Sequence, residues 1–273
     1  MVEVPRIALI GAPTDIHSSF LRGPAGAPAA IRAALLSNHA NSFAEDGTEI
    51  GTDIDMDDVG DLSLTESPGD DALIEAAVTN AARCGAMPLV LGGDHAISLP
   101  VVAALAAIHG PLNILHFDAH PDIYDDFEGD PRSHASPFAR IMEGGYAKRL
   151  VQVGIRTVNR HCREQIARFG VEVVEMRSFT PEAVPVLNGP LYISIDMDGF
   201  DPSVAPGVSH IEPGGLSTRD VLNVLARQIA PLVGADIVEL NPLRDVNGMT
   251  AILAAKLIRE LAALRLRNGG VKT

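Results

Sequence analysis

Short runs of apolar residues recur along the chain, each bounded by Gly, Pro or Asp. Such runs predict strands buried on both faces, which is typical of a parallel sheet covered by helices on either side. The predicted strands are RIALIG (6–11), PLVLGG (88–93), LNILHFD (112–118), LVQVGI (150–155), VEVVEM (171–176), LYISID (191–196) and VGADIVEL (233–240).

Helices are predicted between these runs, because apolar residues there recur at every third and fourth position. The predicted helical segments are residues 26–36, 70–84, 98–110, 136–145, 159–170, 217–229 and 249–266. Ser217 and Asp220 have the spacing of an N-terminal capping box. No linker or repeat interrupts the alternation, so the sequence predicts a doubly wound α/β fold and a single domain over residues 1–273.

Composition and charge restrict the partners. Thirty-five acidic against 21 basic residues give a net charge of −14, which disfavours nucleic acid and anionic membranes and favours a small cationic substrate or metal cations. The alternative is that the charge serves only solubility. Cys84 and Cys162 are too few for a disulfide framework or a Cys-rich zinc site. With no basic and apolar leader and no run of membrane-spanning length, we expect a cytoplasmic protein.

Polar side chains follow four of the predicted strands at their carboxyl ends, the edge where ligands bind in open α/β sheets. Asp118, His120 and Asp122 stand at alternate positions directly after an apolar run, so in an extended segment they point the same way. These three residues could also belong to a solvated turn. The full set of candidate metal ligands is His95, Asp118, His120, Asp122, Asp196 and Asp198.

This set of ligands favours a dinuclear metal centre. Four carboxylates gathered without cations would repel one another, whereas two divalent ions would balance their charge. Structural zinc usually takes four ligands that include thiolates, and this set has none. Oxygen-rich ligation with two imidazoles suits manganese or another divalent first-row metal. Two such ions can share one water and lower its pKa.

Four motifs carry a family resemblance: GGDHAIS (92–98), DAHPDIY (118–124), SIDMDGFDPSVAPG (194–207) and DIVELNP (236–242). Their content and order resemble the ureohydrolases, the arginase and agmatinase family, and the likeness is closest to plant-type arginases. The resemblance implies a three-layer α/β fold with an eight-stranded, mainly parallel sheet and helices on both faces. It also implies a homo-oligomer, usually a trimer or hexamer.

The resemblance further implies two Mn²⁺ ions per chain and hydrolysis of a small guanidino substrate to urea and an amine. One ion would be held by His95, Asp118, Asp122 and Asp196, and the other by His120, Asp118, Asp196 and Asp198. Glu239 would pair with the planar guanidinium. His134 would supply the proton that the leaving amine needs, with Asp122 as the other candidate. The alternatives are a helix cap or surface charge at Glu239 and a loop histidine without function at His134.

The identity of the substrate depends on residues near these motifs. Tyr124, shared by plant-type arginases and agmatinases, stands where animal arginases usually carry an asparagine that reads the amino acid end of arginine. His210 replaces a threonine that is commoner in the family. Both are candidate substrate contacts.

The loop between residues 122 and 136 gives conflicting indications. Its acids favour a cationic tail such as that of agmatine, and they are Asp125, Asp126, Glu128 and Asp130. Arg132, Ser133 and Ser136 are candidate donors to the carboxylate of arginine, and Ser136 is included among the predicted substrate-binding residues. We expect L-arginine as the substrate, with agmatine or another guanidino compound as the alternative. A mononuclear deacetylase and a non-catalytic subunit fit less well, because no ligand of the second metal is missing.

Overall fold

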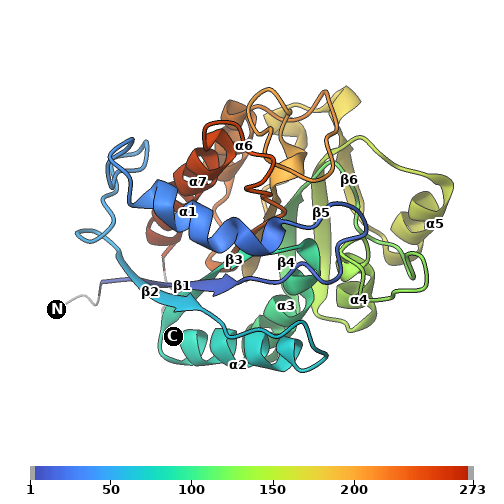
Figure 1. Ribbon diagram of the computed structural model, residues 1–273, viewed down its shortest axis with the longest axis horizontal. Coiled ribbons are helices and arrows are strands. Elements are labelled where there is room, and N and C mark those ends of the chain that lie inside the picture. Colours follow the sequence, from blue (N-terminus) through green and yellow to red (C-terminus); the bar gives the residue numbers. More distant parts are fainter. Residues whose placement is uncertain (1–3, 270–273) are drawn as a thin grey trace.

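The computed structural model describes residues 4–269 and has an eight-stranded sheet at its centre (Figure 1). The strand order is β2-β1-β3-β8-β7-β4-β5-β6, and every neighbouring pair is parallel. The strands are β1 Arg6–Ala12, β2 Asp55–Asp61, β3 Ala86–Gly92, β4 Leu112–Phe117, β5 Ala147–Ile155, β6 Glu172–Glu175, β7 Leu191–Asp196 and β8 Leu232–Val238.

In the described part of the chain, seven α-helices cover the two faces of the sheet, in the segments where the sequence predicts them. They are α1 Ala27–Leu35, α2 Asp70–Arg83, α3 Ser98–His109, α4 Pro137–Glu143, α5 Arg160–Phe169, α6 Thr218–Arg227 and α7 Met249–Arg267. Helices α1, α6 and α7 pack on one face, and α2 to α5 pack on the other (Figure 1). The capping box of Ser217 and Asp220 is present at the start of α6. The predicted three-layer α/β fold is confirmed.

Strand β2 was not predicted from the apolar pattern. Its sequence, DMDDVGD, is acidic and largely exposed. It lies at the edge of the sheet and pairs only with β1, where the register shifts between Leu9 and Ile10. An edge strand is joined to the sheet through its backbone and can keep polar side chains, so periodicity of apolar residues does not reveal it.

The order of the strands decides where the candidate ligands meet. Strands β3, β8, β7 and β4 are neighbours at the centre of the sheet, although β3 and β8 lie far apart in the chain. Because all four are parallel, their carboxyl ends open at the same edge. Residues that follow these four strands are therefore brought together.

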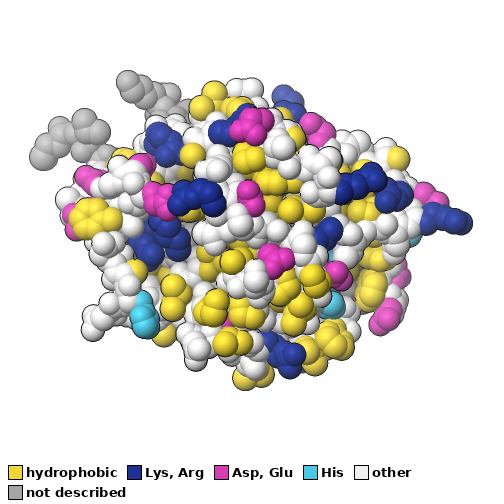
Figure 2. Space-filling model, turned by 90° about the horizontal axis from the view of Figure 1, so that it is seen from above, with side chains coloured by type: hydrophobic (Ala, Val, Ile, Leu, Met, Phe, Trp, Pro, Cys, Tyr) yellow, Lys and Arg dark blue, Asp and Glu magenta, His cyan; other side chains and the backbone are white. Residues whose placement is uncertain are grey.

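The surface on the side of α6 and α7 is mixed. Hydrophobic side chains gather across the middle of this face, with Lys, Arg, Asp and Glu scattered between and around them (Figure 2). The exposed apolar residues of the chain include Leu36 and Leu243, each 81% exposed. Within residues 4–269, no helix has both the length and the apolar character needed to cross a bilayer.

Candidate functional site

The six predicted metal ligands converge at the carboxyl edge of the central strands. They form two groups, in each of which the potential ligand atoms lie within 4.8 Å of one another. One group is His95, Asp118, Asp122 and Asp196; the other is Asp118, His120 and Asp198. Asp118, directly after β4, belongs to both groups. The structure thus brings together side chains from the ends of β3, β4 and β7.

His95 has the geometry of a metal ligand. Its Nδ1 lies 3.0 Å from Asp122 Oδ2, 3.1 Å from Asp196 Oδ2 and 3.4 Å from Asp118 Oδ2. Its Nε2 lies 2.9 Å from the Ser194 hydroxyl. Nδ1 is buried and has no hydrogen-bond partner among the described residues. With Nε2 as the donor to Ser194, the Nδ1 lone pair is free to face the three carboxylates and bind a cation.

The second group forms around His120, whose Nδ1 lies 3.1 Å from Asp198 Oδ2 and 3.4 Å from Asp118 Oδ1. Asp196 Oδ1 accepts from the Asp198 backbone N–H at 2.8 Å, which fixes one carboxylate beside the other. A Cβ at Gly199 would come within 2.8 Å of the Asp118 backbone nitrogen. A glycine at this position therefore lets the ends of β7 and β4 approach closely.

The buried carboxylates of the cluster are destabilised in their ionised form unless positive charge lies among them. Burial raises the pKa of Asp196 well above its ordinary value, and the neighbouring Asp198 and Asp118 raise it further. Burial also raises the pKa of Asp198 to about 7, although His120 opposes the shift. Bound cations would remove this penalty by favouring the ionised carboxylates. The buried oxygens and imidazole nitrogens therefore fit a pair of divalent metal ions.

A buried hydrogen-bond network that sequence reasoning missed orients the candidate ligands from the side away from the pocket. Ser194 donates to Asp236 Oδ1 at 2.7 Å, which leaves its oxygen lone pairs to accept from His95. His116 Nε2 lies 2.8 Å from Asp118 Oδ2 and holds that carboxylate in place. The signal was present in the sequence, because Ser194 and His116 each stand two positions before an aspartate that is a candidate ligand, on the same face of a strand.

The Ser194→Ala variant is expected to bind manganese about 10- to 100-fold more weakly, the usual cost of removing a partner that orients a metal ligand. His95 Nε2 would lose its acceptor, so its Nδ1 would no longer be held toward the carboxylates. Manganese titration of the metal-free protein measures the change. Ser178→Ala, a surface control, should leave affinity unchanged; equal affinity in the two variants would contradict the role given to Ser194.

His134 and Glu239 form a second unit beside the metal groups. His134 Nδ1 lies 2.8 Å from Glu239 Oε1, which also accepts from the His95 backbone N–H at 2.9 Å. Burial lowers the pKa of His134, but the carboxylates of Glu239, Asp122 and Asp94, with Glu239 contributing most, together raise it to about 9. Both acceptor positions of Oε1 are used, and among the described residues no donor bonds Oε2. Glu239 therefore keeps one oxygen for a cationic ligand.

The backbone is strained at two of these positions. Glu239 has φ of 63° and Asp122 has φ of 44°, values that residues other than glycine rarely adopt. Such conformations cost about 1–3 kcal/mol each and cluster at functional sites, where they aim a side chain. Here the turn at Glu239 ends β8 and directs its carboxylate to His95 and His134.

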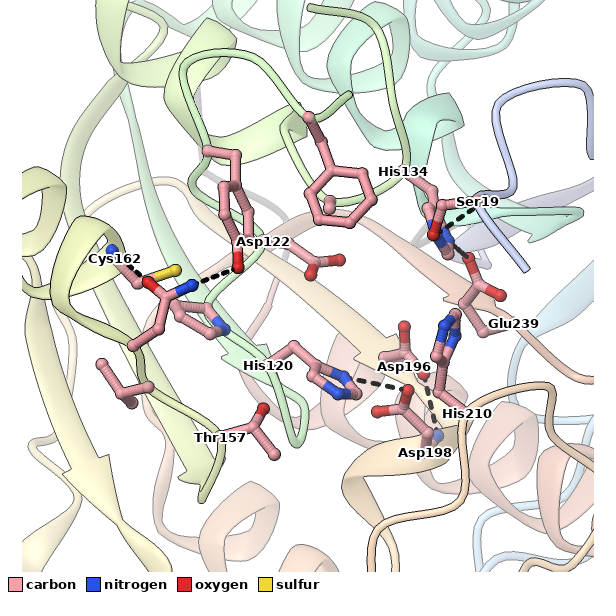
Figure 3. A pocket seen from close by; sticks show the side chains of 16 residues that line it. Ser19, His120, Asp122, His134, Thr157, Cys162, Asp196, Asp198, His210 and Glu239 are labelled. Carbon is pink, nitrogen blue, oxygen red and sulfur yellow. Dashed lines mark hydrogen bonds and ion pairs between the residues drawn. The ribbon is translucent and has the colours of Figure 1, made fainter. Parts of the chain in front are cut away.

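A pocket of about 420 Å³ opens over this unit and over both metal groups (Figure 3). His134 and Glu239 lie on one side of it and Cys162 on the other, with Asp122, Asp196 and Asp198 between them (Figure 3). Two predicted substrate contacts, Tyr124 and His210, line it as well. The ring of His210 lies 5.4 Å from that of His134 and 5.8 Å from that of His120.

Ser136 does not reach this pocket. Its side chain is fully buried at the N-terminus of α4 and is absent from the described residues that line the cavity. The structure therefore does not bring this candidate substrate contact to the pocket: Ser136 follows His134 by two positions, but it stands at the start of α4 and its side chain is buried. Arg132 and Ser133 are absent from the lining too, and Arg132 pairs with Asp71.

The part of the pocket lining that the sequence assigned to Arg132, Ser133 and Ser136 is formed by other residues. Ser19 enters from the loop after β1, Thr157 and Asn159 come from the turn between β5 and α5, and Cys162 comes from the first turn of α5. The Asn159 amide donates to the Tyr124 hydroxyl at 2.5 Å. No motif identified these residues, because β5 contributes no metal ligand.

Comparisons with known proteins agree with this geometry. The sequence profile of the "Arginase family" matches residues 5–263. Arginase 1, mitochondrial, of Arabidopsis thaliana is 53% identical, over 94% of this chain and 80% of that protein. Agmatinase, mitochondrial, of Gallus gallus is 34% identical, over 97% of this chain and 82% of that protein. The solved arginase of Medicago truncatula superposes with a TM-score of 0.90 at 46% identity, covering 96% of this chain and 88% of that one.

The prediction of a cytoplasmic protein is wrong by the same comparisons. Similar plant arginases are named mitochondrial, and one is named chloroplastic/mitochondrial. Delivery to an organelle depends on a targeting segment and not on the catalytic fold, so composition could not decide the compartment.

The family follows from three agreeing matches. The family profile matches most of this chain, a plant arginase matches over most of both chains, and a solved arginase has the same fold. This chain belongs to the arginase family of ureohydrolases.

Proposed function

We propose that residues 1–273 form a single catalytic domain that hydrolyses L-arginine to ornithine and urea, with agmatine as the alternative substrate. The observation that carries the proposal is the pocket itself, which opens over two His/Asp groups and has Glu239 and His134 in its wall. A site with this charge suits a cationic head group. The match to plant arginases supports arginine in particular.

Two Mn²⁺ ions per chain are proposed, although other first-row divalent ions suit the same donors. His95, Asp118, Asp122 and Asp196 would hold one ion, and His120, Asp118, Asp196 and Asp198 the other. When bound, such a pair lowers the pKa of a shared water and so supplies the nucleophile. The orphaned Nδ1 of His95, facing three carboxylates, supports this assignment.

The chain's own residues bind the substrate and move its proton. Glu239 Oε2 pairs with the guanidinium and holds its carbon over the metal groups, while Oε1 stays bonded to His95 and His134. When the C–N bond breaks, the leaving amine takes a proton. His134 is the proposed donor, and Asp122, which lines the same pocket, is the other candidate.

The lining of the pocket favours the amino acid end of arginine. The acids that argued for a cationic tail are absent from the described lining. Asp125 pairs with His161, Asp130 pairs with His17, and Asp126 accepts from a backbone N–H. The neutral groups of Thr157 and Asn159 line the pocket instead, so its outer part does not repel an α-carboxylate.

We therefore expect kcat/KM for L-arginine to exceed that for agmatine. Urea release by the manganese-loaded protein, measured side by side at equal, subsaturating concentrations of the two substrates, provides the comparison. Guanidinobutyrate and guanidine serve as further substrates to define which end of the molecule is read. Faster urea release from agmatine would overturn the choice of substrate but leave the ureohydrolase assignment intact.

A homo-oligomer, a trimer or hexamer, is also proposed. The apolar side chains that gather on the face over α6 and α7 support it, because large exposed apolar patches mark interaction surfaces (Figure 2).

A further inference from the structure

Ser19 is the residue through which His134 meets the pocket. It lies in the loop between β1 and the 3₁₀ turn at Pro24–Gly26. Its backbone N–H donates to His134 Nε2 at 3.1 Å, and its hydroxyl oxygen lies 2.8 Å from the same nitrogen (Figure 3). Ser19 is exposed and lines the pocket, whereas His134 is only 7% exposed.

Both ring nitrogens of His134 are thus engaged by other residues. In the neutral ring, Nε2 carries a lone pair that accepts from the Ser19 N–H, and the ring proton sits on Nδ1 and bonds Glu239 Oε1. When Nε2 gains a proton, the Ser19 hydroxyl oxygen is in place to accept it. Ser19 therefore has a hydrogen-bonding group for each protonation state of Nε2. Its backbone amide donates to the unprotonated nitrogen, and its hydroxyl oxygen accepts from the protonated one.

The loop that carries Ser19 is fixed against the site at several points. The His17 backbone N–H donates to Asp94 Oδ2 at 2.9 Å, and the His17 carbonyl accepts from the His134 backbone N–H at 3.1 Å. Asp15 accepts from the Gly23 backbone N–H at 2.7 Å, which closes the far end of the loop. These contacts hold the Ser19 hydroxyl within hydrogen-bonding distance of the His134 imidazole.

We propose that the Ser19 hydroxyl relays the proton from His134 to the departing amine, a step that rests on the proposed guanidino hydrolysis. As the C–N bond breaks, its electron pair stays on the amine nitrogen, and that nitrogen takes the hydroxyl hydrogen of Ser19. The Ser19 oxygen takes the proton from Nε2 at the same time. His134 ends neutral, the amine leaves protonated and Ser19 is unchanged.

Ser19→Ala separates the relay from simple positioning, because alanine keeps the backbone N–H that orients the imidazole and loses only the hydroxyl. We expect kcat for the manganese-loaded enzyme to fall about 10- to 100-fold, at or below the low end of what positioned acid–base groups contribute, because water can enter the space left and carry part of the proton transfer. KM should not change. Ser19→Thr keeps a hydroxyl and should restore most of kcat. Ser18→Ala, the neighbouring serine, is the matched control.

A readout that does not depend on activity completes the test. Nitrogen NMR of the metal-free protein, recorded above the His134 pKa of about 9, where the ring is neutral, should give His134 the same Nδ1–H tautomer in wild type and Ser19→Ala. The relay is overturned if Ser19→Ala keeps wild-type kcat, if threonine does not rescue it, or if the His134 tautomer changes, since the loss would then come from positioning. A wild-type protein that releases no urea from any guanidino compound overturns the proposed function and the relay together.

Discussion

The Asp118→Asn variant is expected to lose its urea-releasing activity together with most of its bound metal. Asp118 belongs to both metal-ligand groups, and its two oxygens lie near His95 on one side and His120 on the other. Neutralising it removes one negative charge from both sites at once. The loss should exceed the roughly 100-fold upper cost of an outer partner, because a direct ligand is changed. Elemental analysis and a urea assay measure the two effects.

Asp126→Asn is the matched control for this experiment. Asp126 follows Asp118 by eight positions, is exposed and is absent from the described lining of the pocket. It should keep two metals per chain and normal turnover. If purified Asp118→Asn also keeps two metals and turns over at nearly the normal rate, the shared ligand has been assigned to the wrong residue.

Glu239→Gln should behave in the opposite way toward metal, keeping full occupancy while losing most activity. A charge-assisted pair with the guanidinium contributes about 1.5–3 kcal/mol, which corresponds to a fall in kcat/KM of about 10- to 160-fold. The same change removes the largest of the charges that raise the pKa of His134 to about 9. NMR titration of the metal-free variant should therefore give a lower pKa for His134.

The control for this variant is Glu128→Gln, an exposed acid of the neighbouring loop that the pocket lining does not include. Loss of metal from Glu239→Gln, with occupancy kept in the control, would mean that Glu239 is a ligand and does not bind the substrate.

The sequence predicts the buried part of this fold well and its edge poorly. Seven strands and seven helices follow from apolar patterns, because each must bury a face against the sheet or the helices. Strand β2 breaks the rule, since hydrogen bonds to β1 hold it and its aspartates remain in solvent. The family resemblance implies an eighth strand, but no local pattern indicates where it lies.

The same distinction applies to the site. The grouping of the candidate metal ligands could be predicted because each stands at or shortly after the end of an apolar strand, where the parallel topology brings such residues together. The contact of Ser19 with His134 could not be predicted, because Ser19 lies in a loop 115 positions earlier in the chain. The placement of Ser136 in the pocket could not be predicted either. Ser136 is close to His134 in sequence, but this closeness does not fix the direction of its side chain at the start of a helix.

The central position of β8 has a consequence for biosynthesis. Among the strands of residues 4–269, β8 is the last to be synthesised, yet it lies between β3 and β7. Until it emerges, the nascent chain can pair β2, β1 and β3 in one ribbon and β7, β4, β5 and β6 in another, with nothing to join the two. His95 belongs to the first ribbon and Asp118 to the second. The candidate ligands at the ends of β3, β4 and β7 can therefore come together in a newly made chain only when β8 has been inserted between the two ribbons.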